Sequence, residues 1–501
     1  MAINLRSPYY TGTAIANTAY ATLDITIWEG LSTDVVTAQY NLRKSVVGTD
    51  VAVYFEISEL IRDYLDIAFD GNYTGQNVWV KTVQTVYNSS NVVISIAPFT
   101  QIAYDSYSYF EEPEFNIVKN SVLIDNREIF ALEDNFFRVP INTKNNPSIV
   151  FYNNSEIVYS DILANSNNSS NQIKYISING NDSNFDTFFE RVVESGGTYE
   201  DNICIQSFIN SYSIGQVDKI IVSADYYGNE LIINGDFATP YYWSILGSDT
   251  ISGGKLNISG VGTRKSTSFI PIVGKKYVLT FDITDYTSGN IIVFDGSNGV
   301  NLSGNLNAVG TYTYTYTQTQ TANNNLNFFV PTGFVGSIDN VSIVESFGIK
   351  TDTITVKTIE ECKYEPKKVT FINKFGALQD MYFFKKSVEK MAVEKESYKS
   401  NIISSLGTYN PTNHVNRDFN VIGRESITLS SGFLSEEYNE VFKQMMLSEK
   451  VWVTNILETG EQVVPINVKT SEITYKTSLN NKLVEYTIEF DKSFDTINNI
   501  R

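Results

Sequence analysis

Hydrophobic and polar residues alternate with a period of two along much of this chain, as they do in strands with one buried face. The pattern is clear in TAYATLDITIWEG and VWVKTVQTVYN, which lie between residues 14 and 103, and it returns in NSVLIDN, NPSIVFY and DKIIVSA. Gly, Asn and Asp separate these runs, as expected of turns. The pattern therefore predicts a mainly β protein made of several β-sandwich domains with short helices.

Two stretches have helical spacing instead. In ISELIRDYLDIAF the apolar residues Ile57, Leu60 and Ile61 recur at the spacing of one helix face, which predicts a short helix crossing the first sandwich. In SEEYNEVFKQMMLSEK, which begins at Ser435, a similar apolar stripe predicts a second helix. Between them, KKVTFINKFGALQDMYFFKK predicts two strands around a tight turn, followed by a charged, solvent-facing stretch over 385–400.

The texture of the chain changes near residue 229. From there to GSIDNVSIVES the sequence consists of short strands and glycine turns, and the flanking runs DKIIVSAD and TDTITVKT read as neighbouring strands of one domain. Insertions are tolerated at exposed loops whose ends lie close together. We therefore expect an inserted domain over 229–346. The other expected divisions are 1–104, 105–228 together with 347–400, and an α+β domain over 401–501.

Charge and composition exclude several classes of function. The chain has 501 residues and a net charge of −19, which argues against nucleic acid as its main partner. Its one histidine, His414, lies in the turn-rich YNPTNHVNRD, so histidine-based zinc sites and catalytic triads are not expected. No phosphate-binding, dinucleotide-binding or hydrolase motif is present, and we expect no enzymatic activity. Cys204 and Cys362 are expected as two buried thiols, with one long-range disulfide as the alternative.

The start of the chain, MAINLRSPYYTG, contains no apolar core of a signal peptide, and no run of 18 apolar residues predicts a membrane span. The chain nevertheless has 32 Tyr and a texture rich in Asn, Thr and Gly, which is typical of proteins that work outside cells. A virion component, assembled in the host cytoplasm and released by lysis, reconciles these two observations.

The ends of the expected insert carry two motifs. The first is ELIINGDFATPYYW, with Asn234, Gly235 and Asp236, and the second is GSIDNVSIVES, with Asp339. Together they resemble carbohydrate-binding modules of the family 4/9 type, which implies a jelly roll whose first and last strands lie side by side. The resemblance implies a structural Ca²⁺ held by Asn234, Asp236 and Asp339 with backbone carbonyls. The alternative is that these three residues only cap turns.

Such modules hold sugars with aromatic rings and with Asn, Asp and Gln side chains, so the resemblance also implies a binding site. The candidate side chains are Tyr241, Tyr242, Trp243, Asp282, Tyr286, Asn290, Phe294, Tyr312, Tyr314 and Tyr316. Trp243 is equally well explained as core. The three tyrosines of TYTYTYTQT share one face of a strand, either as a wall of the core or as an exposed aromatic platform, and we expect them to be at least partly exposed. An insert without a sugar site would act as a spacer.

The flanking sequence is similar to tail proteins of phages that infect Bacteroidetes-type bacteria. The similarity rests on RSPYY, ISELIRDYLDIAFDG, AYDSYSYFEE, FINKFGALQDMYFFKK and GFLSEEYNEVFKQMMLSEKVWV. It implies a structural protein of the virion tail, in the distal or baseplate region, that assembles with identical subunits in a ring or other oligomer and with other tail proteins. Its insert would then contact host-surface polysaccharide. The alternatives are a bacterial carbohydrate-active or glycan-binding surface protein, and a phage head fibre or decoration protein.

Overall fold

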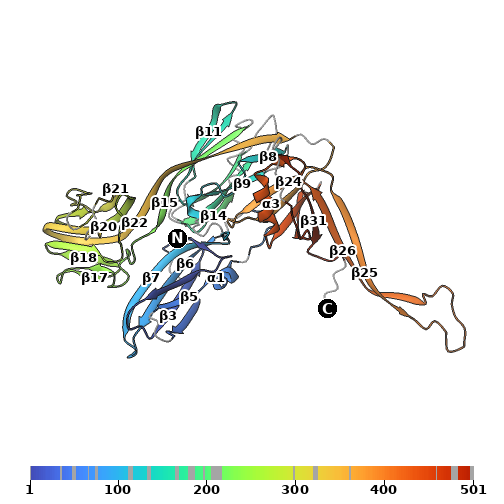
Figure 1. Cartoon of the computed structure of the whole chain (residues 1–501), viewed down its shortest axis with the longest axis horizontal. Helices are drawn as coiled ribbons and strands as arrows, with labels where there is room; N and C mark the ends of the chain where they lie inside the picture. Colours follow the sequence, from blue (N-terminus) through green and yellow to red (C-terminus); the bar gives the residue numbers. More distant parts are fainter. Residues whose placement is uncertain are drawn as a thin grey trace.

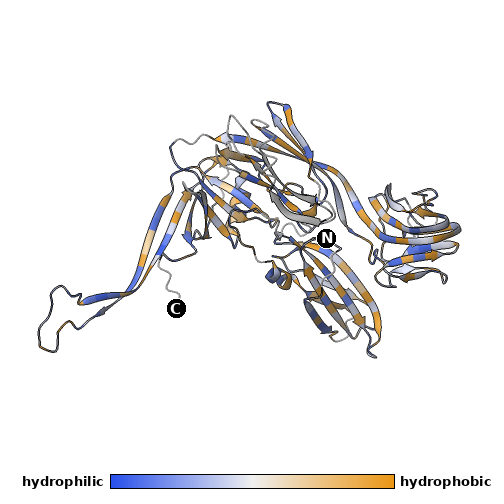
Figure 2. Cartoon of the chain, turned by 180° about the vertical axis from the view of Figure 1, so that it is seen from behind, coloured by the Kyte–Doolittle hydropathy of each residue, from blue (hydrophilic) through white to orange (hydrophobic). Residues whose placement is uncertain are grey.

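The computed structural model describes residues 2–33, 37–47, 52–65, 67–73, 77–110, 117–132, 137–163, 169–178, 187–195, 198–204, 217–296, 299–319, 325–359, 363–457, 460–474 and 483–496. Strands dominate it, and the mainly β architecture expected from the alternating sequence is confirmed (Figure 1). Apolar and polar residues alternate along most strands (Figure 2). Cys362 lies outside the described residues, so the expected state of the two cysteines stays a prediction.

The N-terminal domain contains a five-stranded sheet in the order β1-β7-β6-β3-β4, a separate pair β2-β5, and the helix α1. The bounds are β1 Ile3–Asn4, β2 Tyr10–Ala14, β3 Tyr20–Trp28, β4 Tyr40–Ser45, β5 Ala52–Glu56, α1 Ser58–Tyr64, β6 Asn77–Tyr87 and β7 Val93–Tyr104. In β3, Leu23, Ile25 and Ile27 are fully buried and alternate with half-buried residues. Helix α1 confirms the helical spacing, because Ile57 and Ile61 both enter the core of this domain.

The central region is built of two sheets. One has the order β14-β13-β12-β9, and the other joins β11, β10, β15, β22 and β8. The bounds are η1 Ile117–Lys119, β8 Glu128–Leu132, β9 Phe137–Asn142, β10 Ser148–Asn153, β11 Glu156–Ile162, β12 Ile173–Ile178, β13 Thr187–Ser195, β14 Thr198–Cys204, β15 Lys219–Glu230 and β22 Asn327–Ile359. Strand β8 pairs with the end of β22 in parallel.

The C-terminal region is a seven-stranded sheet in the order β24-β23-β28-β29-β31-β26-β25, with helix α3 against it. The bounds are β23 Lys367–Ile372, β24 Leu378–Phe383, β25 Val388–Lys399, β26 Asn416–Ser430, β27 Leu434–Ser435, α3 Tyr438–Met446, β28 Val451–Leu457, β29 Gly460–Val468, β30 Leu483–Val484 and β31 Thr487–Lys492. The expected boundary at residue 400 is wrong, because β23, β24 and β25 belong to this sheet. One hydrophobic core joins it to the central region.

The two local predictions in this region are confirmed with small shifts. Helix α3 begins at Tyr438 rather than Ser435, because Leu434 and Ser435 pair with β30 instead. The tight turn at Lys374-Phe375-Gly376 joins β23 to β24, and Gly376 has a φ of 76°. A Cβ at Gly376 would lie 2.7 Å from the backbone carbonyl carbon of Asp105, so this turn packs directly against the end of the N-terminal domain.

The inserted domain is a two-layer sandwich with its own hydrophobic core. Its strands are β16 Trp243–Ser244, β17 Thr250–Ser252, β18 Lys255–Ser259, β19 Gly262–Ser266, β20 Lys276–Phe294, β21 Gly310–Thr317 and the first part of β22. Long strands β20 and β22 bend and contribute to both layers.

Two continuous strands connect the insert to the central region. Strands β15 and β22 pair from Lys219 with Thr355 to Glu230 with Val344, and β22 then continues into the insert (Figure 1). The connection is therefore a paired ribbon rather than a loose linker, and the insert stands at one end of the molecule. Within the described parts of the chain, no helix has the length and apolar character needed to span a membrane.

Candidate functional site

The two motifs at the ends of the insert lie side by side. The backbone N–H of Val341 donates to the carbonyl of Gly235 at 2.9 Å, and the N–H of Leu231 donates to the carbonyl of Ile343 at 2.9 Å. A Cβ at Gly235 would lie 1.9 Å from the carbonyl oxygen of Val341, so a side chain does not fit there. The glycine of the opening motif is therefore explained by this close approach of two backbones.

Asn234 caps the loop that follows it. Its Oδ1 accepts from the backbone N–H of Thr239 at 3.0 Å, and its Nδ2 donates to the carbonyls of Thr239 and Tyr241 at 2.7 and 2.9 Å. The residue is buried and has a φ of 61°, which asparagine tolerates better than most residues. The structure thus shows the turn-capping role for Asn234, and its side-chain amide is engaged with protein.

Asp236 and Asp339 are the remaining candidate metal ligands. Each carboxylate accepts a backbone N–H, from Ala238 at 3.4 Å and from Asn340 at 2.7 Å respectively. Burial raises the pKa of Asp339, and the negative charge of Asp236 acts in the same direction against the hydrogen bond from Asn340. The described residues contain no group of three or more His, Cys, Asp or Glu arranged to hold a metal ion. Calcium binding stays a prediction.

Two of the aromatic candidates, Trp243 and Tyr316, belong to the core of the insert, and Tyr242, Tyr312 and Tyr314 pack against it. Trp243 is buried, with ring centroids 4.9 Å from Phe237 and 6.1 Å from Phe328. Tyr316 is buried, whereas Tyr312 and Tyr314 are half-buried and stack on one inward-facing phenylalanine. The three tyrosines of β21 therefore form a wall of the core, and Tyr312 and Tyr314 keep part of their surface in solvent.

The other candidates are separated in space. Tyr241 and Tyr242 are half-buried, and the hydroxyl of Tyr242 lies 3.2 Å from that of Ser95 in the N-terminal domain. Tyr286, 37% exposed, donates to the carbonyl of Gly289 at the bend of β20.

Asp282 lies where β20 pairs with β21, on the solvent side of that layer of the insert. Both of its carboxylate oxygens accept hydrogen bonds, from the hydroxyl of Thr311 at 2.6 Å and from the amide of Asn340 at 2.7 Å. The predicted residues thus do not form one site.

Phe294 and Asn290 lie on the outer face of the layer formed by β16, β19, β22 and β20. One row of paired residues across this layer is fully buried and therefore identifies the inward face. It consists of Val293, Phe328 and Arg264. Side chains alternate between faces along a strand, so the neighbouring rows point outward.

Two outward rows make the candidate face. One row contains Phe294, Asn327, Lys265 and Ser244, and the next contains Ile292, Phe329 and Thr263. The rings of Phe294 and Phe329 meet edge to face with centroids 6.1 Å apart. Beside them, the hydroxyl of Thr332 donates to Oδ1 of Asn290 at 2.6 Å. We refer to these nine residues as the aromatic face.

Asn327 is a residue of the aromatic face whose side-chain amide lacks hydrogen bonds to the described residues. Its side chain is 1% exposed, and neither its oxygen nor its nitrogen has a hydrogen-bond partner among the described residues. A buried amide without partners costs about 1–3 kcal/mol, and such groups in native proteins usually have a role or a bound partner. Its neighbours in the row are Phe294 and Lys265, so an aromatic ring and a cation flank this amide.

Sequence reasoning missed Lys265, Asn327 and Phe329. They come from strands that lie more than 25 residues from Phe294 in the sequence and join it only through the pairing of β19 and β22 with β20. The alternation in NFFV was the available signal, because it places Asn327 and Phe329 on the face opposite the buried Phe328.

A buried ion pair supports the aromatic face from inside. Arg264 and Asp249 have fully buried side chains and form a two-pronged pair at 2.7 and 2.8 Å. The guanidinium also donates to the carbonyls of Gly262 and Gly260 at 2.9 and 3.0 Å. Burial alone would raise the pKa of Asp249, but hydrogen bonds from Arg264 and from two backbone N–H groups outweigh it and lower that pKa. Arg264 lies between Thr263 and Lys265, so it anchors the strand that carries them.

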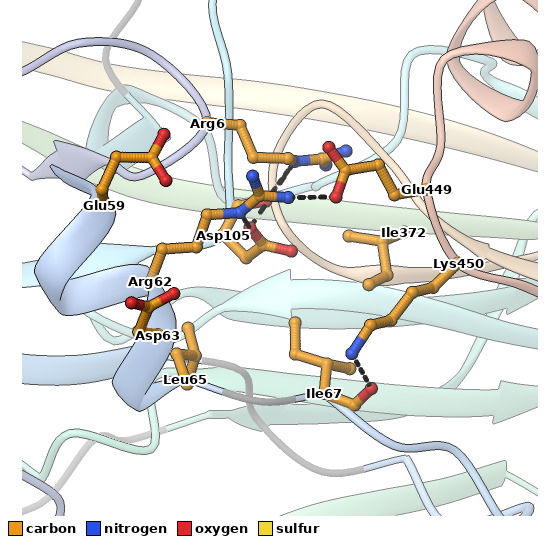
Figure 3. A pocket seen from close by; sticks show the side chains of 10 residues that line it. All are labelled: Arg6, Glu59, Arg62, Asp63, Leu65, Ile67, Asp105, Ile372, Glu449 and Lys450. Atoms are coloured by element: carbon orange, nitrogen blue, oxygen red, sulfur yellow. Dashed lines mark hydrogen bonds and ion pairs between the residues drawn. The ribbon is translucent and has the colours of Figure 1, made fainter.

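A separate pocket of about 340 Å³ lies where the N-terminal domain meets the C-terminal region (Figure 3). Figure 3 shows Arg6, Arg62 and Asp105 pointing toward one another at its wall. The Arg62 side chain forms an ion pair with Glu449, and the Nζ of Lys450 donates to the carbonyl of Ile67 at 2.7 Å. Arg62 therefore pairs with a carboxylate, and Lys450 with a backbone carbonyl, across the junction.

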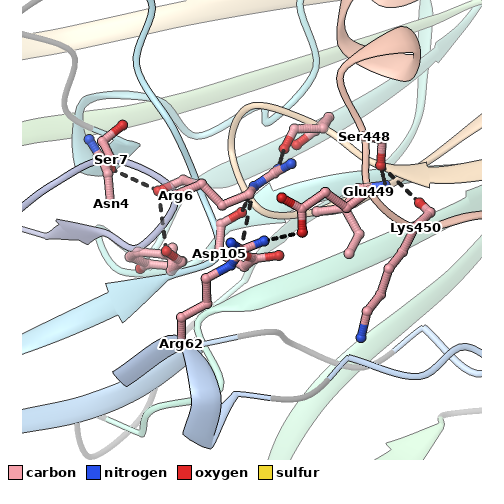
Figure 4. A network of polar contacts seen from close by, with 12 residues as sticks. Asn4, Arg6, Ser7, Arg62, Asp105, Ser448, Glu449 and Lys450 are labelled. Atoms are coloured by element: carbon pink, nitrogen blue, oxygen red, sulfur yellow. Dashed lines mark hydrogen bonds and ion pairs between the residues drawn. The ribbon is translucent and has the colours of Figure 1, made fainter. Parts of the chain in front are cut away.

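The network around Arg6 ties three parts of the chain together (Figure 4). Its guanidinium donates to the carbonyl of Asp105 at 3.1 Å and to the carbonyl of Asn373 at 2.6 Å, and it lies over the ring of Tyr107. Burial raises the pKa of Asp105, against the opposing effect of Arg6 and Arg62. We interpret this pocket as a junction that holds two domains together rather than as a ligand site.

Comparisons with known proteins identify no family for this chain. No protein-family model matches it, and no curated protein matches it. Among solved structures, a Bacteroides ovatus protein, SGBP-B of a mixed-linkage glucan utilization locus in complex with a mixed-linkage heptasaccharide, is 10% identical. That match covers 67% of this chain and 72% of the other, with a TM-score of 0.13, and a likeness at this level supports no conclusion about function.

Proposed function

We propose that this protein is a non-enzymatic structural protein that binds polysaccharide through the aromatic face of its inserted domain. The observation that carries the proposal is the pair Phe294 and Phe329 on an outward sheet surface, next to the buried amide of Asn327, which has no partner among the described residues. The resemblance of the insert's end motifs to carbohydrate-binding modules supports the same choice of ligand.

The chemistry of the face suits a sugar chain. Aromatic rings offer flat apolar surfaces for the C–H faces of pyranose rings, and a few well-placed polar groups orient a ligand by hydrogen bonds. The polar groups here are the amides of Asn327 and Asn290 and the ammonium of Lys265. A sugar ring stacked on the two phenylalanines would bring a hydroxyl next to Asn327, whose buried amide receives no hydrogen bond from any described residue.

The side chains of the aromatic face argue against glycoside hydrolysis there. Hydrolysis generally needs two carboxyl groups that flank the scissile bond, one as an acid and one as a base or nucleophile. None of the nine residues of the aromatic face is Asp or Glu. The face therefore supplies binding groups without a general acid, which favours adhesion over cleavage.

The biological setting that we propose is a phage tail, in which identical subunits assemble with other tail proteins and the insert contacts polysaccharide on the host surface. The similarity of the flanking segments to tail proteins supports this setting. A glycan-binding protein of a bacterial surface would use the same aromatic face, and so would a head fibre or decoration protein. Native mass spectrometry and imaging of the intact protein distinguish them, because a tail component forms a defined ring and a monomer contradicts the tail setting.

Glycan binding is tested with the full chain against immobilised capsular and cell-wall polysaccharides from candidate host bacteria, by biolayer interferometry. A variant with Phe294→Ala and Phe329→Ala should bind at least about tenfold more weakly, because truncating central aromatic contacts usually costs more than 1 kcal/mol. The matched control is Thr313→Ala with Thr315→Ala, two exposed residues on the outer surface of the layer that contains β21. Absence of binding to every polysaccharide, or equal binding by both variants, contradicts the proposal.

A further inference from the structure

A long hairpin leaves the body of the protein at the end opposite the insert (Figure 1). It consists of β25 and the part of β26 from Asn416 to Glu425, joined by residues 400–415, and we call residues 388–425 the arm. Strand β26 pairs with β31 only from Ser426 onward, so within the arm β25 and β26 pair as strands only with each other. Residues 492–496 bond to the base of the arm at Gly423 to Glu425, and among the described residues none of these contacts reaches the arm beyond that base. At about 3.3 Å per residue, the 12 residues of β25 span about 40 Å.

The arm is exposed on both of its faces. Every residue of β25 is exposed, and most of β26 up to Glu425 is exposed or half-buried. A two-stranded hairpin without further packing is at best marginally stable in water. Cross-strand ion pairs such as Lys395 with Asp418 at 2.6 Å hold the ribbon together, but exposed pairs of this kind contribute little. The length and exposure of the arm therefore indicate that it packs against another surface in the assembled protein.

Apolar side chains are concentrated on the arm. Nine of the thirty large exposed hydrophobic side chains in the described chain lie between residues 388 and 419, with Leu406 88% exposed at the tip. They are Val388, Met391, Val393, Tyr398, Ile403, Leu406, Tyr409, Val415 and Phe419. The rings of Tyr398 and Phe419 meet edge to face with centroids 5.6 Å apart, so they form a preordered aromatic pair near the tip. Clustered exposed apolar side chains of this kind mark interaction surfaces.

The charge of the tip differs from that of the rest of the chain. Residues 397–417 contain no Asp or Glu and include Lys399 and Arg417, which gives the tip a charge of +2 with His414 neutral. Because the whole chain carries −19, the remainder carries −21. A cationic, apolar tip is thus complementary to the acidic surface of the same protein, and the like-charged bodies would otherwise repel one another.

We propose that the arm docks on the body of a second copy of this chain, with the apolar tip residues as the contact and the charge difference as the source of orientation. This inference rests on the proposed assembly of identical subunits, and it adds the surface that makes the contact. It does not depend on glycan binding, because the insert and the arm lie at opposite ends of the molecule (Figure 1).

The test measures the mass of the full chain by native mass spectrometry and by sedimentation over a range of concentrations. Wild type should form an oligomer. A variant in which residues 397–417 are replaced by Asn-Gly should be monomeric, and this change leaves intact the base of the arm, where β26 pairs with β31. Leu406→Asp with Tyr409→Asp should raise the dissociation constant at least about tenfold without affecting folding, since both side chains are largely exposed.

The control is Ile270→Asp with Val309→Asp, two similarly exposed apolar residues in the insert, and it should leave the oligomer unchanged. A wild-type monomer overturns both this inference and the proposed assembly. A wild-type oligomer that survives loss of residues 397–417 overturns only the role of the arm. Binding of the tip to a different protein, while the oligomer persists without it, assigns the arm another partner and also overturns the inference.

Discussion

Replacing Arg264 by alanine should destabilise the inserted domain selectively. The side chains of Arg264 and Asp249 are both fully buried, so the substitution leaves a carboxylate in the core without its cation. It also removes the hydrogen bonds to the carbonyls of Gly260 and Gly262. Removing one partner of a buried pair typically costs about 3–5 kcal/mol. For a unit of this size, that loss lowers the melting temperature on the order of 10–20 °C.

Scanning calorimetry of the full chain measures this loss. Because the insert has its own hydrophobic core, we expect it to unfold as a separate transition, and only that transition should move. Lys265→Ala is the control, since it changes the next residue of the same strand, on the outward face. Arg264→Met with Asp249→Leu should destabilise less than Arg264→Ala alone, because no unpaired charge stays buried. A shift below about 1 kcal/mol for Arg264→Ala would refute this reasoning.

The same pair predicts a response to acid. The pKa of Asp249 is lowered in the folded insert, so its contribution to stability is present above its unfolded value of 3.8 and is lost as the pH falls through the folded pKa. In Arg264→Ala this stabilisation is absent, so the insert should lose less of its remaining stability below pH 3.8 than wild type loses. A melting series from pH 5 to pH 2.5 compares the two slopes.

Three further substitutions test other contacts. Burial raises the pKa of Glu230 above 4.5 in the folded state, so wild type should lose stability as the pH rises from 4.5 through that pKa, and Glu230→Gln should make the slope shallower in a pH series of thermal melts. Gly235→Ala should cost about 1–3 kcal/mol in urea unfolding, because the new Cβ would overlap the carbonyl oxygen of Val341; an unchanged midpoint contradicts this contact. Arg62→Ala should cost about 1 kcal/mol in the same assay, since its partner Glu449 is 63% exposed and its buried partner Asp105, 3.5 Å away, keeps Arg6 as a counter-ion; a loss above about 3 kcal/mol would show that Arg6 alone does not compensate the charge of Asp105.

Features that depend on residues close together in the sequence were predictable from it. The alternation in TYTYTYT gives β21, and the apolar stripe after Ser435 gives α3, because side-chain spacing alone determines which face is buried. The closeness of the NGDF and IDNV motifs also followed, since a resemblance to a jelly roll implies that its first and last strands are neighbours. These predictions needed only the local periodicity or a short motif.

Features that depend on strand register were not predictable. Phe294 was expected to contact a ligand, but its neighbours Phe329 and Asn327 follow from bends in β20 and β22 that shift their pairing several times. The boundary expected at residue 400 failed because the charged, solvent-facing stretch after Lys385 contains β25, which pairs with β26 of the C-terminal sheet across that boundary. The pairing of Arg264 with Asp249 likewise depends on how two turns fold back over the core, and nothing in their 15-residue separation predicts it.

The arrangement of the two proposed surfaces has a mechanical consequence. Strand β22 runs without interruption from the aromatic face, through the paired ribbon with β15, into the central sheet, whose core is continuous with that of the sheet bearing the arm. A load applied to polysaccharide bound at Phe329 would therefore be carried along hydrogen-bonded strands rather than across a flexible linker. Because the arm projects from the opposite end (Figure 1), a subunit held by its neighbour keeps the aromatic face free. Adhesion and assembly can then act at the same time, as the proposed tail setting requires.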